Sequence, residues 1–402
     1  MCANNIEEGV TIDLGRMNTT TYDETKGLVS ILPAARWLHV YQTLDPLNVG
    51  IPGGRIGTVG VGGLVMGGGF SFYLYQRGLV CDSVRNFEVV LASGKIINAN
   101  SGENADLHTA LKGGAGNFGI VTRVDMNAFE RAPIWGGTRT YPESATEDHI
   151  QAIVGWTENI ENYQNGSAVI FWTYKPADGA IVVNSVLTDV GGAVAAPTFD
   201  EFLAIPGYTS SNLGVTNMST LAQGTQADGY RLTNIGTNVW FTLTFANDVR
   251  ILRKAVELHK TLVEEMLQES SDGDLETQCF FQPFPTVVGR HSAERGGNIL
   301  GVDAITDNSI VWLGSLAVNG IDQEKLARQK MQAWKDTLEE YSRSFGAHVG
   351  YRYANYADQT QAVMESYGEE NSQKMQAVSG KYDPDGIFQT RAPGGFKLPD
   401  EV

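Results

Sequence analysis

A glycine-rich segment from Ile51 to Gly69 constrains this chain more than any other feature of its sequence. It runs Ile51-Pro-Gly-Gly-Arg-Ile-Gly-Thr-Val-Gly-Val-Gly-Gly-Leu-Val-Met-Gly-Gly-Gly69. Glycine lets another group approach the main chain closely, so such a segment can hold a pyrophosphate with its backbone amides. It can equally be an array of tightly packed turns, and the segment alone leaves both interpretations open.

The segment does not match the two best-known phosphate-binding loops. A P-loop ends in Gly-Lys-Ser/Thr, and that tripeptide is not present. A dinucleotide fingerprint has the pattern Gly-x-Gly-x-x-Gly, but Gly60-Val-Gly62 is followed by Val65 where the third glycine belongs. The sequence therefore argues against a P-loop nucleotidase and against a nicotinamide-dependent dehydrogenase.

Length and charge exclude further classes. The chain has 402 residues, more than one compact core usually holds, so two lobes are expected. Its net charge of -17 disfavours a nucleic-acid partner. No apolar run approaches the roughly 20 residues that a membrane span requires. The three cysteines and six histidines show no metal-ligand spacing, so no metal site is expected.

The apolar pattern changes along the chain. Short strands and turns are expected at the start, with alternation in Val10-Thr-Ile-Asp-Leu14 and a β-hairpin turning at Ser93-Gly94. The middle favours an antiparallel sheet backed by helices, and the fold class is therefore α+β. Strands are expected at residues 167–175, 180–187, 238–246 and 309–317, and helices at 146–163, 248–269 and 322–345.

Several motifs, taken together and in order, resemble one protein family. They are the glycine-rich segment with Arg77-Gly-Leu-Val-Cys-Asp82, then Lys112-Gly-Gly-Ala-Gly-Asn-Phe-Gly-Ile-Val121, Tyr353-Ala-Asn-Tyr356, Tyr367-Gly368 and Lys381-Tyr-Asp-Pro-Asp-Gly-Ile-Phe388. This set resembles the fungal members of the berberine-bridge-enzyme-like FAD-linked oxidoreductases, within the vanillyl-alcohol oxidase and p-cresol methylhydroxylase (PCMH-type) family.

The resemblance implies a two-lobed fold and its division. Residues 1–135 would form a PCMH-type FAD-binding domain, and residues 346–402 would return to it. Residues 136–345 would form a substrate domain with an antiparallel sheet. The family places a histidine that binds FAD covalently upstream of these motifs, so the resemblance also implies an FAD-binding domain that is incomplete at its N-terminus.

The resemblance assigns residues to the cofactor. The first loop would contribute Gly57, Thr58, Val59, Gly60, Gly62 and Gly63, and the neighbouring strand and second loop Asp82, Val84, Gly116, Asn117, Gly119 and Val121. Asn355 would reach FAD from the C-terminal segment. For Asn117 and Asn355 the plain alternative is turn chemistry.

Tyr356 matches the position of a catalytic tyrosine in many relatives, and it would accept the substrate hydroxyl proton as hydride leaves for the flavin. A free tyrosine has a pKa of about 10, so this role requires a neighbouring cation or donor. The alternative is that Tyr356 only packs beside the ring. Val59 matches a position that controls oxygen access, and its small side chain indicates an oxidase that reacts with O2.

Two departures from the family concern the cofactor. Ile56 occupies the position where some relatives bond FAD through a cysteine, so no cysteinyl bond is expected. None of the six histidines lies in the family's Arg-Ser-Gly-Gly-His context. The competing hypothesis is therefore a flavin-free, inactive homologue or a binding protein.

The substrate is expected to be a small hydroxylated molecule, either a secondary-metabolite precursor or a carbohydrate. Its pocket would be lined from residues 167–175, 238–246, 277–286 and 309–317. Neither localisation nor oligomeric state follows from the sequence. Candidate aromatic lining residues are Phe171, Trp172, Phe280, Phe281 and Trp312.

Overall fold

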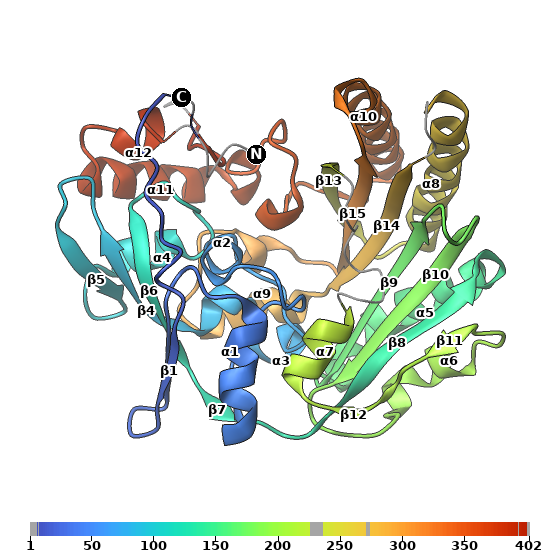
Figure 1. The fold of residues 1–402 in the computed structure, drawn as a ribbon, viewed down its shortest axis with the longest axis horizontal. Helices are drawn as coiled ribbons and strands as arrows, with labels where there is room; N and C mark the ends of the chain where they lie inside the picture. The colour runs from blue at the N-terminus through green and yellow to red at the C-terminus, as the bar shows by residue number, and fades with distance from the viewer. Residues whose placement is uncertain (1–5, 7, 226–235, 271–273, 393, 400–402) are drawn as a thin grey trace.

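Two antiparallel sheets organise the computed structural model, which describes residues 6, 8–225, 236–270, 274–392 and 394–399. A five-stranded sheet uses strands from the first part of the chain, and a nine-stranded sheet uses strands from the middle. Figure 1 shows the two sheets in separate lobes with short helices between them. This mixed architecture confirms the expected α+β fold class.

The smaller sheet has the strand order β1-β2-β6-β4-β5. The expected hairpin is present as β4 and β5, with Val90 paired to Ile96 and Gly94 in the turn at φ 79°. Helix α4 packs on β5, and α11 packs on α4. The elements are β1 (Thr20–Asp23), β2 (Leu28–Ile31), β4 (Val84–Val90), β5 (Ile96–Asn100), β6 (Ile120–Asn127), α4 (Ala105–Leu111) and α11 (Glu369–Tyr382).

The larger sheet has the strand order β11-β8-β10-β9-β14-β15-β13-β16, with β12 paired to β8. The strands described for this sheet all pair antiparallel. Its strands are β8 (Ile134–Pro142), β9 (Gly166–Tyr174), β10 (Ile181–Asp189), β11 (Ser210–Ser211), β12 (Gly214–Thr216), β13 (Thr237–Ala246), β14 (Leu275–Phe284), β15 (Ser309–Val318) and β16 (His348–Val349). A separate pair joins β3 (Val49–Gly50) to β7 (Phe129–Glu130).

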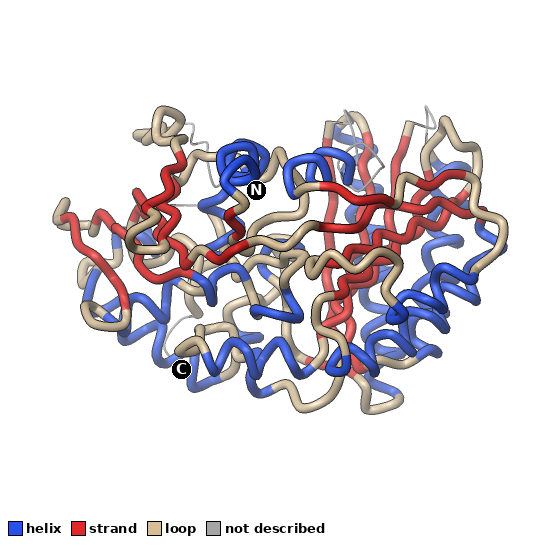
Figure 2. Tube along the Cα trace, turned by 90° about the horizontal axis from the view of Figure 1, so that it is seen from below, coloured by secondary structure: helices blue, strands red, loops and turns tan. Residues whose placement is uncertain are grey.

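Three amphipathic helices cover the outer face of the larger sheet, as Figure 2 shows from below. They are α5 (Thr146–Asn159), α8 (Val249–Glu269) and α10 (Ile321–Ser344). In α8 the buried residues recur every three or four positions, which turns one stripe toward the strands. The Asp248 side chain caps this helix by accepting from the Arg250 amide at 2.8 Å.

The opposite face of the larger sheet is turned toward the other lobe. Helix α3 (Leu74–Arg77) packs against β9, and the short 3₁₀ helix Ala354–Tyr356 packs against β13. The remaining helices are α1 (Trp37–Leu44), α2 (Val61–Met66), α6 (Asp200–Ala204), α7 (Met218–Thr225), α9 (Thr286–Glu294) and α12 (Ile387–Thr390). The inner face of the sheet therefore meets α3, which follows the glycine-rich segment, and the C-terminal segment.

Two expectations differ from this picture. Residues Val10 to Leu14 form no strand, and Val10 and Ile12 are 87% and 62% exposed. Alternation alone was insufficient, because these residues have no neighbouring strand among those described. Strand β16 lies beyond residue 345 yet pairs with β13 of the larger sheet. The exact domain boundaries stay a prediction.

Glu339 of α10 joins the C-terminal segment to the larger lobe. It accepts from Arg343 at 2.7 Å and Arg352 at 3.0 Å, and Lys335 lies 3.3 Å away. Burial acts to raise the pKa of Glu339, but the hydrogen bonds and charges of these cations outweigh it and lower the pKa to about 2. The carboxylate therefore stabilises the folded state above its ordinary pKa of 4.5.

We predict that Glu339→Gln lowers the free energy of unfolding by about 1–3 kcal/mol at neutral pH. The difference from the unchanged protein should shrink as pH falls from 4.5 toward about 2, where the folded-state carboxyl takes up its proton. Urea denaturation across pH checks this. The exposed neighbour Glu340 provides a matched control, Glu340→Gln, and equal losses from both changes would contradict the prediction.

Candidate functional site

Some glycines of the 51–69 segment are explained by packing. A Cβ atom on Gly53 would lie 2.3 Å from Trp37 Cζ3, and one on Gly54 would lie 2.5 Å from Trp37 Cδ1. Tyr41 holds the same backbone by donating to the Gly54 carbonyl at 2.8 Å. These two glycines let the segment run directly against the buried face of α1.

Gly57 and Gly62 also make contacts within the chain. The Gly57 amide donates to the Ala222 carbonyl at 3.1 Å, and the Gly62 amide donates to the Pro33 carbonyl at 3.2 Å. A Cβ on Gly57 would lie 2.9 Å from Leu38 Cβ. In this conformation both amides are used internally, so packing explains these two glycines.

Gly60, Gly63 and Gly116 are different. Among the described residues, none comes within 4 Å of a Cβ on Gly63 or Gly116, and a Cβ on Gly60 would meet only Arg36 Nη1, at 3.9 Å. Their backbone does not adopt the left-handed conformation that favours glycine. Neither packing nor backbone conformation therefore requires glycine at these positions. They fit the alternative interpretation, in which a bound group approaches the main chain.

Asp82 lies in the 3₁₀ helix Val80–Ser83 and organises the protein around it. Its carboxylate accepts from the Leu79 backbone amide at 2.8 Å, the Ser292 hydroxyl at 2.6 Å and Asn298 Nδ2 at 2.9 Å. Burial raises the pKa of Asp82, and these donors act against that rise. The residue links the first lobe to residues 292–298.

The other residues assigned beside it are also packed. The Val84 carbonyl accepts from His108 Nε2 at 3.1 Å, and Val121 belongs to the buried core. A Cβ on Gly119 would lie 2.5 Å from Val89 Cγ1, so this glycine allows close contact between strands.

Asn117 and Asn355 attach the C-terminal segment to the two glycine loops. Asn117 Nδ2 donates to the carbonyls of Gly114 at 2.8 Å and Phe396 at 2.9 Å. Asn355 Nδ2 donates to the carbonyls of Leu64 and Gly67, each at 3.2 Å. Only the Asn117–Gly114 bond is of the turn type that the plain alternative describes, and the other bonds join segments far apart in the sequence. Both side chains position backbone beside the open glycines.

Tyr356 has the cationic neighbour that its expected role requires. Arg55 Nη2 donates to the Tyr356 hydroxyl at 2.9 Å, although Arg55 is only 4% exposed. Arg55 also donates to Gln282 Oε1 of β14. Gln282 Nε2 in turn donates to the Tyr75 hydroxyl at 3.0 Å. Three distant parts of the chain thus meet at one guanidinium.

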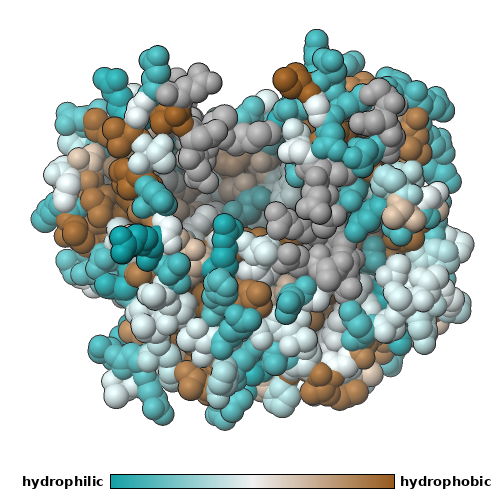
Figure 3. All heavy atoms as spheres, viewed as in Figure 1, coloured by the Kyte–Doolittle hydropathy of each residue, from teal (hydrophilic) through white to brown (hydrophobic). Residues whose placement is uncertain are grey.

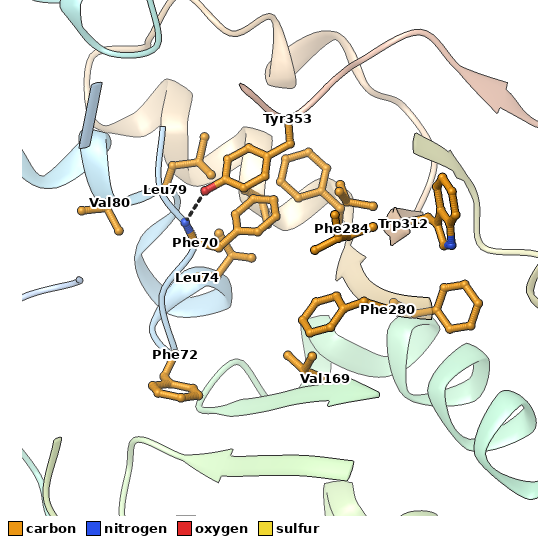
Figure 4. Packing of buried hydrophobic residues seen from close by; sticks show 14 of the residues in the cluster. Phe70, Phe72, Leu74, Leu79, Val80, Val169, Phe280, Phe284, Trp312 and Tyr353 are labelled. Atoms are coloured by element: carbon orange, nitrogen blue, oxygen red, sulfur yellow. Dashed lines mark hydrogen bonds between the residues drawn. The ribbon is translucent and has the colours of Figure 1, made fainter. Parts of the chain in front are cut away.

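Aromatic rings pack against the Tyr356 ring. The Tyr356 ring packs edge-on against Phe70, Trp240 and Phe280, with centroids 6.0, 6.1 and 6.1 Å away. Phe70 stacks on Tyr353 at 3.9 Å, and its amide donates to the Tyr353 hydroxyl at 3.0 Å, as Figure 4 shows. The site therefore pairs one buried cation with a largely apolar, aromatic wall.

The expected aromatic lining is only partly correct. Phe171 and Phe280 stack on each other on the inner face of the sheet, where Phe280 reaches Tyr356. Trp172, Phe281 and Trp312 do not line this face, because Trp172 packs on Phe281 and bonds Thr146 near α5, and Trp312 packs on Trp334 of α10. Strand alternation places these three against the helices.

The space near Tyr356 includes a small cavity of about 180 Å³ lined by Asn238, Trp240, Ala357, Asp358 and Gln359. Ile56, Thr58 and Val59 are half-buried on the neighbouring loop, and Arg36 donates to the Thr58 carbonyl at 2.7 Å. Figure 3 shows the molecule hollowed between its two lobes.

Four residues of the site were not singled out from the sequence: Arg55, Gln282, Tyr75 and Trp240. Gln282 and Trp240 nevertheless lie within the expected lining segments 277–286 and 238–246. Arg55 had a detectable signal, because it is a lone charged residue among the glycines of the first loop. Gln282 had a weaker one, as a polar residue within an apolar strand. Arg55 contacts Gln282, 227 residues away in the sequence, and Tyr356, 301 residues away. Both are tertiary contacts, which local sequence signals do not reveal.

Two further features bear on the class of protein. Within the described ranges, no group of three or more histidine, cysteine, aspartate or glutamate side chains is arranged to bind a metal. In the same ranges, no helix has both the length and the apolarity needed to cross a bilayer.

Comparison with known proteins gives consistent matches. The sequence model of the FAD binding domain matches residues 1–100. The chain is 36% identical to the FAD-dependent monooxygenase drtC of Aspergillus calidoustus, covering 98% of this chain and 74% of that protein. It is 38% identical to the FAD-dependent monooxygenase sdcF of Emericella nidulans, covering 98% and 82%.

Solved structures share the fold at low identity. The structure of 6-hydroxy-D-nicotine oxidase from Arthrobacter nicotinovorans superposes with a TM-score of 0.75 at 19% identity, covering 99% of this chain and 84% of that one. Xylooligosaccharide oxidase from Myceliophthora thermophila superposes with a TM-score of 0.72 at 19% identity, covering 98% and 82%.

The contacts of Asp82 predict a structural role for its side chain. Asp82→Ala should lower the free energy of unfolding by about 2–4 kcal/mol, because two buried donors and one half-buried donor lose their acceptor. Chemical denaturation measures this loss. Unchanged stability together with a selective loss of cofactor would instead support the direct contact that the resemblance implies.

Proposed function

Because this chain belongs to the berberine-bridge-enzyme-like family of FAD-linked oxidoreductases, we propose that it oxidises a hydroxylated small molecule with FAD and O2. The observation that carries the proposal is the Arg55–Tyr356 contact, which puts a buried cation 2.9 Å from a phenol at the inner face of the larger sheet. Once it has lost its own proton, this oxygen can accept the proton of a substrate hydroxyl.

The reaction divides between cofactor and chain. When bound, FAD would supply the acceptor for the hydride of the substrate carbon and the route by which the two electrons reach O2, with peroxide as the product. Tyr356 takes the hydroxyl proton, so the substrate C–O bond becomes a carbonyl. The aromatic wall of Phe70, Phe280 and Trp240 keeps water away from that proton transfer.

The open glycines support the cofactor site. Gly60, Gly63 and Gly116 would let FAD approach the main chain of the two loops, since among the described residues only Arg36 comes within 4 Å of a Cβ at these positions, at 3.9 Å from Gly60. Ile56 offers no sulfur, so we infer that FAD is held without a cysteinyl bond. The proposed substrate is either a secondary-metabolite precursor or a carbohydrate. The fungal monooxygenase relatives favour the first, and the xylooligosaccharide oxidase fold neighbour favours the second.

The second candidate function is monooxygenation, because the fungal relatives are named FAD-dependent monooxygenases. A monooxygenase inserts one oxygen atom of O2 into the product, whereas an oxidase releases both as peroxide. Val59 is a small, half-buried side chain on the first loop, which supports access of O2 in either case. Product analysis with ¹⁸O-labelled O2 separates the two, since label in the product would contradict the oxidase.

We predict that Tyr356→Phe slows anaerobic flavin reduction about 10²–10⁴-fold while the amount of bound FAD is unchanged, because a general base is lost. Stopped-flow absorbance with a substrate found by screening measures this. Tyr353→Phe is the matched control, since Tyr353 stacks on the same Phe70 but does not contact Arg55 in the described bonds. An unchanged rate of flavin reduction in Tyr356→Phe would show that Tyr356 is not the proton acceptor.

Gly63→Ala should weaken FAD binding at least about tenfold, because the new methyl group occupies the space open to the cofactor. The same change should leave the melting temperature equal or higher, since alanine favours the α2 helix over glycine. Titration with FAD and thermal denaturation measure the two effects. Unaltered affinity would mean that Gly63 does not face the cofactor.

Val59→Leu should slow reoxidation of reduced flavin by O2 about tenfold or more and leave its reduction by substrate unchanged, because the larger side chain narrows access for O2. Val59→Ala serves as the control that keeps the space open. If both variants reoxidise at the original rate, Val59 has no part in the reaction with O2.

A further inference from the structure

A second group of charged and aromatic side chains has no part in the site around Tyr356. Arg77 ends α3, and its guanidinium carbon lies 3.5 Å from the centre of the Phe129 ring. Tyr73, at the start of the same helix, packs edge-on against that ring, with centroids 5.0 Å apart. Arg131 lies in the connection between β7 and β8, and its side chain is only 8% exposed. Helix α3 thus meets the connection between the lobes at one aromatic ring.

A third arginine approaches Arg77 from the end of α9. Helix α3 packs on α9, and a Cβ on Gly78 would lie 3.4 Å from both His291 Cβ and the Ser292 backbone nitrogen. Arg295 directly follows α9 and comes four residues after His291, so it lies on the same side of the helix. Burial and the positive charge of Arg295 both lower the pKa of Arg77. Two like charges are therefore close together in a chain whose net charge is -17.

Several polar atoms of this group have no hydrogen-bond partner among the described residues. They are Arg77 Nε, Arg131 Nε and the Tyr73 hydroxyl, and all three are buried. In the part of the chain that the structure describes, the guanidinium of Arg77 contacts the Phe129 ring but forms no ion pair or hydrogen bond. Arg295 donates only to a backbone carbonyl of α9, at 3.5 Å. Buried polar groups are normally satisfied, so these donors indicate a missing acceptor.

The acidic side chains near this group do not supply that acceptor. Asp45 lies 3.5 Å from Arg131 Nη2. Glu294 is next to Arg295, but its side chain is 56% exposed, so water and salt screen the attraction between the two charges. Within the described ranges, no carboxylate forms an ion pair with Arg77 or Arg295. The surroundings of Arg77 are therefore positively charged.

Tyr73 adds a neutral donor to these cations. Burial raises the pKa of Tyr73 to about 12, although the charges of Arg131 and Arg77 act against the rise. The Tyr73 hydroxyl therefore keeps its proton at neutral pH and can donate it. An anion held between Arg77 and Arg131 would meet two cations and this hydroxyl.

We propose that Arg77, Arg131 and Arg295 form a binding site for a small oxyanion, a phosphate or a carboxylate, at the junction of the two lobes. Both anions present paired oxygen atoms that match the fork of a guanidinium. Phe129 holds the plane of Arg77, and Tyr73 supplies the neutral donor. The bound anion provides the acceptors that these side chains lack and offsets the repulsion between the arginines. Arg77 and Arg295 are half-buried, so a solute can reach them.

The site is independent of the proposed oxidation, and it is tested by isothermal titration calorimetry of the full chain with inorganic phosphate at constant ionic strength. Arg77→Met should weaken phosphate binding at least about tenfold, because the central guanidinium is lost. Arg290→Met is the matched control, since it removes one positive charge from α9 but Arg290 pairs with Glu161 at 2.8 Å and lies outside the group. This control should bind phosphate as the unchanged protein does.

Two results of this titration would overturn the proposal. One is the absence of binding of both phosphate and acetate by the unchanged protein. The other is equal weakening in Arg77→Met and Arg290→Met, which would show non-specific attraction. Acetate also distinguishes the two sources of the oxyanion, since tighter binding of phosphate identifies a phosphorylated ligand and tighter binding of acetate identifies a carboxylate.

FAD carries phosphate groups of its own, so the titration is repeated with saturating FAD. The affinity for phosphate should be unchanged, whereas displacement of phosphate by FAD would place the anion in the cofactor site and overturn the proposal. If the protein binds no FAD, the proposed function fails and the phosphate result stands.

A second variant covers the case in which Arg77→Met does not fold. Arg295→Met changes a half-buried residue that forms no ion pair in the described ranges, and it should also weaken phosphate binding. Phosphate should raise the melting temperature of the unchanged protein above its value in chloride of equal ionic strength, because the anion binds only the folded state. In Arg295→Met this rise should be smaller. Rises of equal size in both proteins would contradict the site.

Discussion

The contact between Arg55 and Tyr356 joins segments separated by 301 residues, and the architecture of the site depends on it. Arg55 comes from the glycine-rich loop, Tyr356 from the C-terminal segment, and Gln282 from the larger sheet. Each of these elements is held elsewhere by its own packing. At the guanidinium, loop, sheet and C-terminal segment converge, and its hydrogen bonds to Gln282 and Tyr356 offset the cost of burying a cation there.

The glycines around this contact perform two different tasks. Gly53, Gly54 and Gly57 let the loop lie against α1, which brings Arg55 to its place. Gly60, Gly63 and Gly116 leave space that the chain itself does not use. Asn117 and Asn355 then tie the C-terminal segment to the loops beside that space. Packing glycines thus build the reaction site, while open glycines support a place for the cofactor next to it.

The sequence predicted the elements well and the side-chain assembly poorly. Helical periodicity located α8 and α10, and the turn glycine located the β4–β5 hairpin, because these signals are local. The resemblance to the family identified Tyr356 as a candidate. The roles of Arg55, Gln282 and Trp240 were identified only from tertiary contacts. Trp172, Phe281 and Trp312 were assigned to the pocket because strand alternation has two possible phases, and helix packing selects the other one.

The proposed function depends on the binding of FAD between these lobes. The most direct measurement is the visible absorption spectrum of the purified protein after incubation with FAD and gel filtration, repeated on the supernatant after acid precipitation. We predict that flavin absorption bands stay with the folded protein during gel filtration. On acid precipitation the same bands should pass entirely into the supernatant. A colourless protein that cannot be reconstituted would contradict it and favour the flavin-free homologue, while flavin bands retained in the pellet would contradict noncovalent binding.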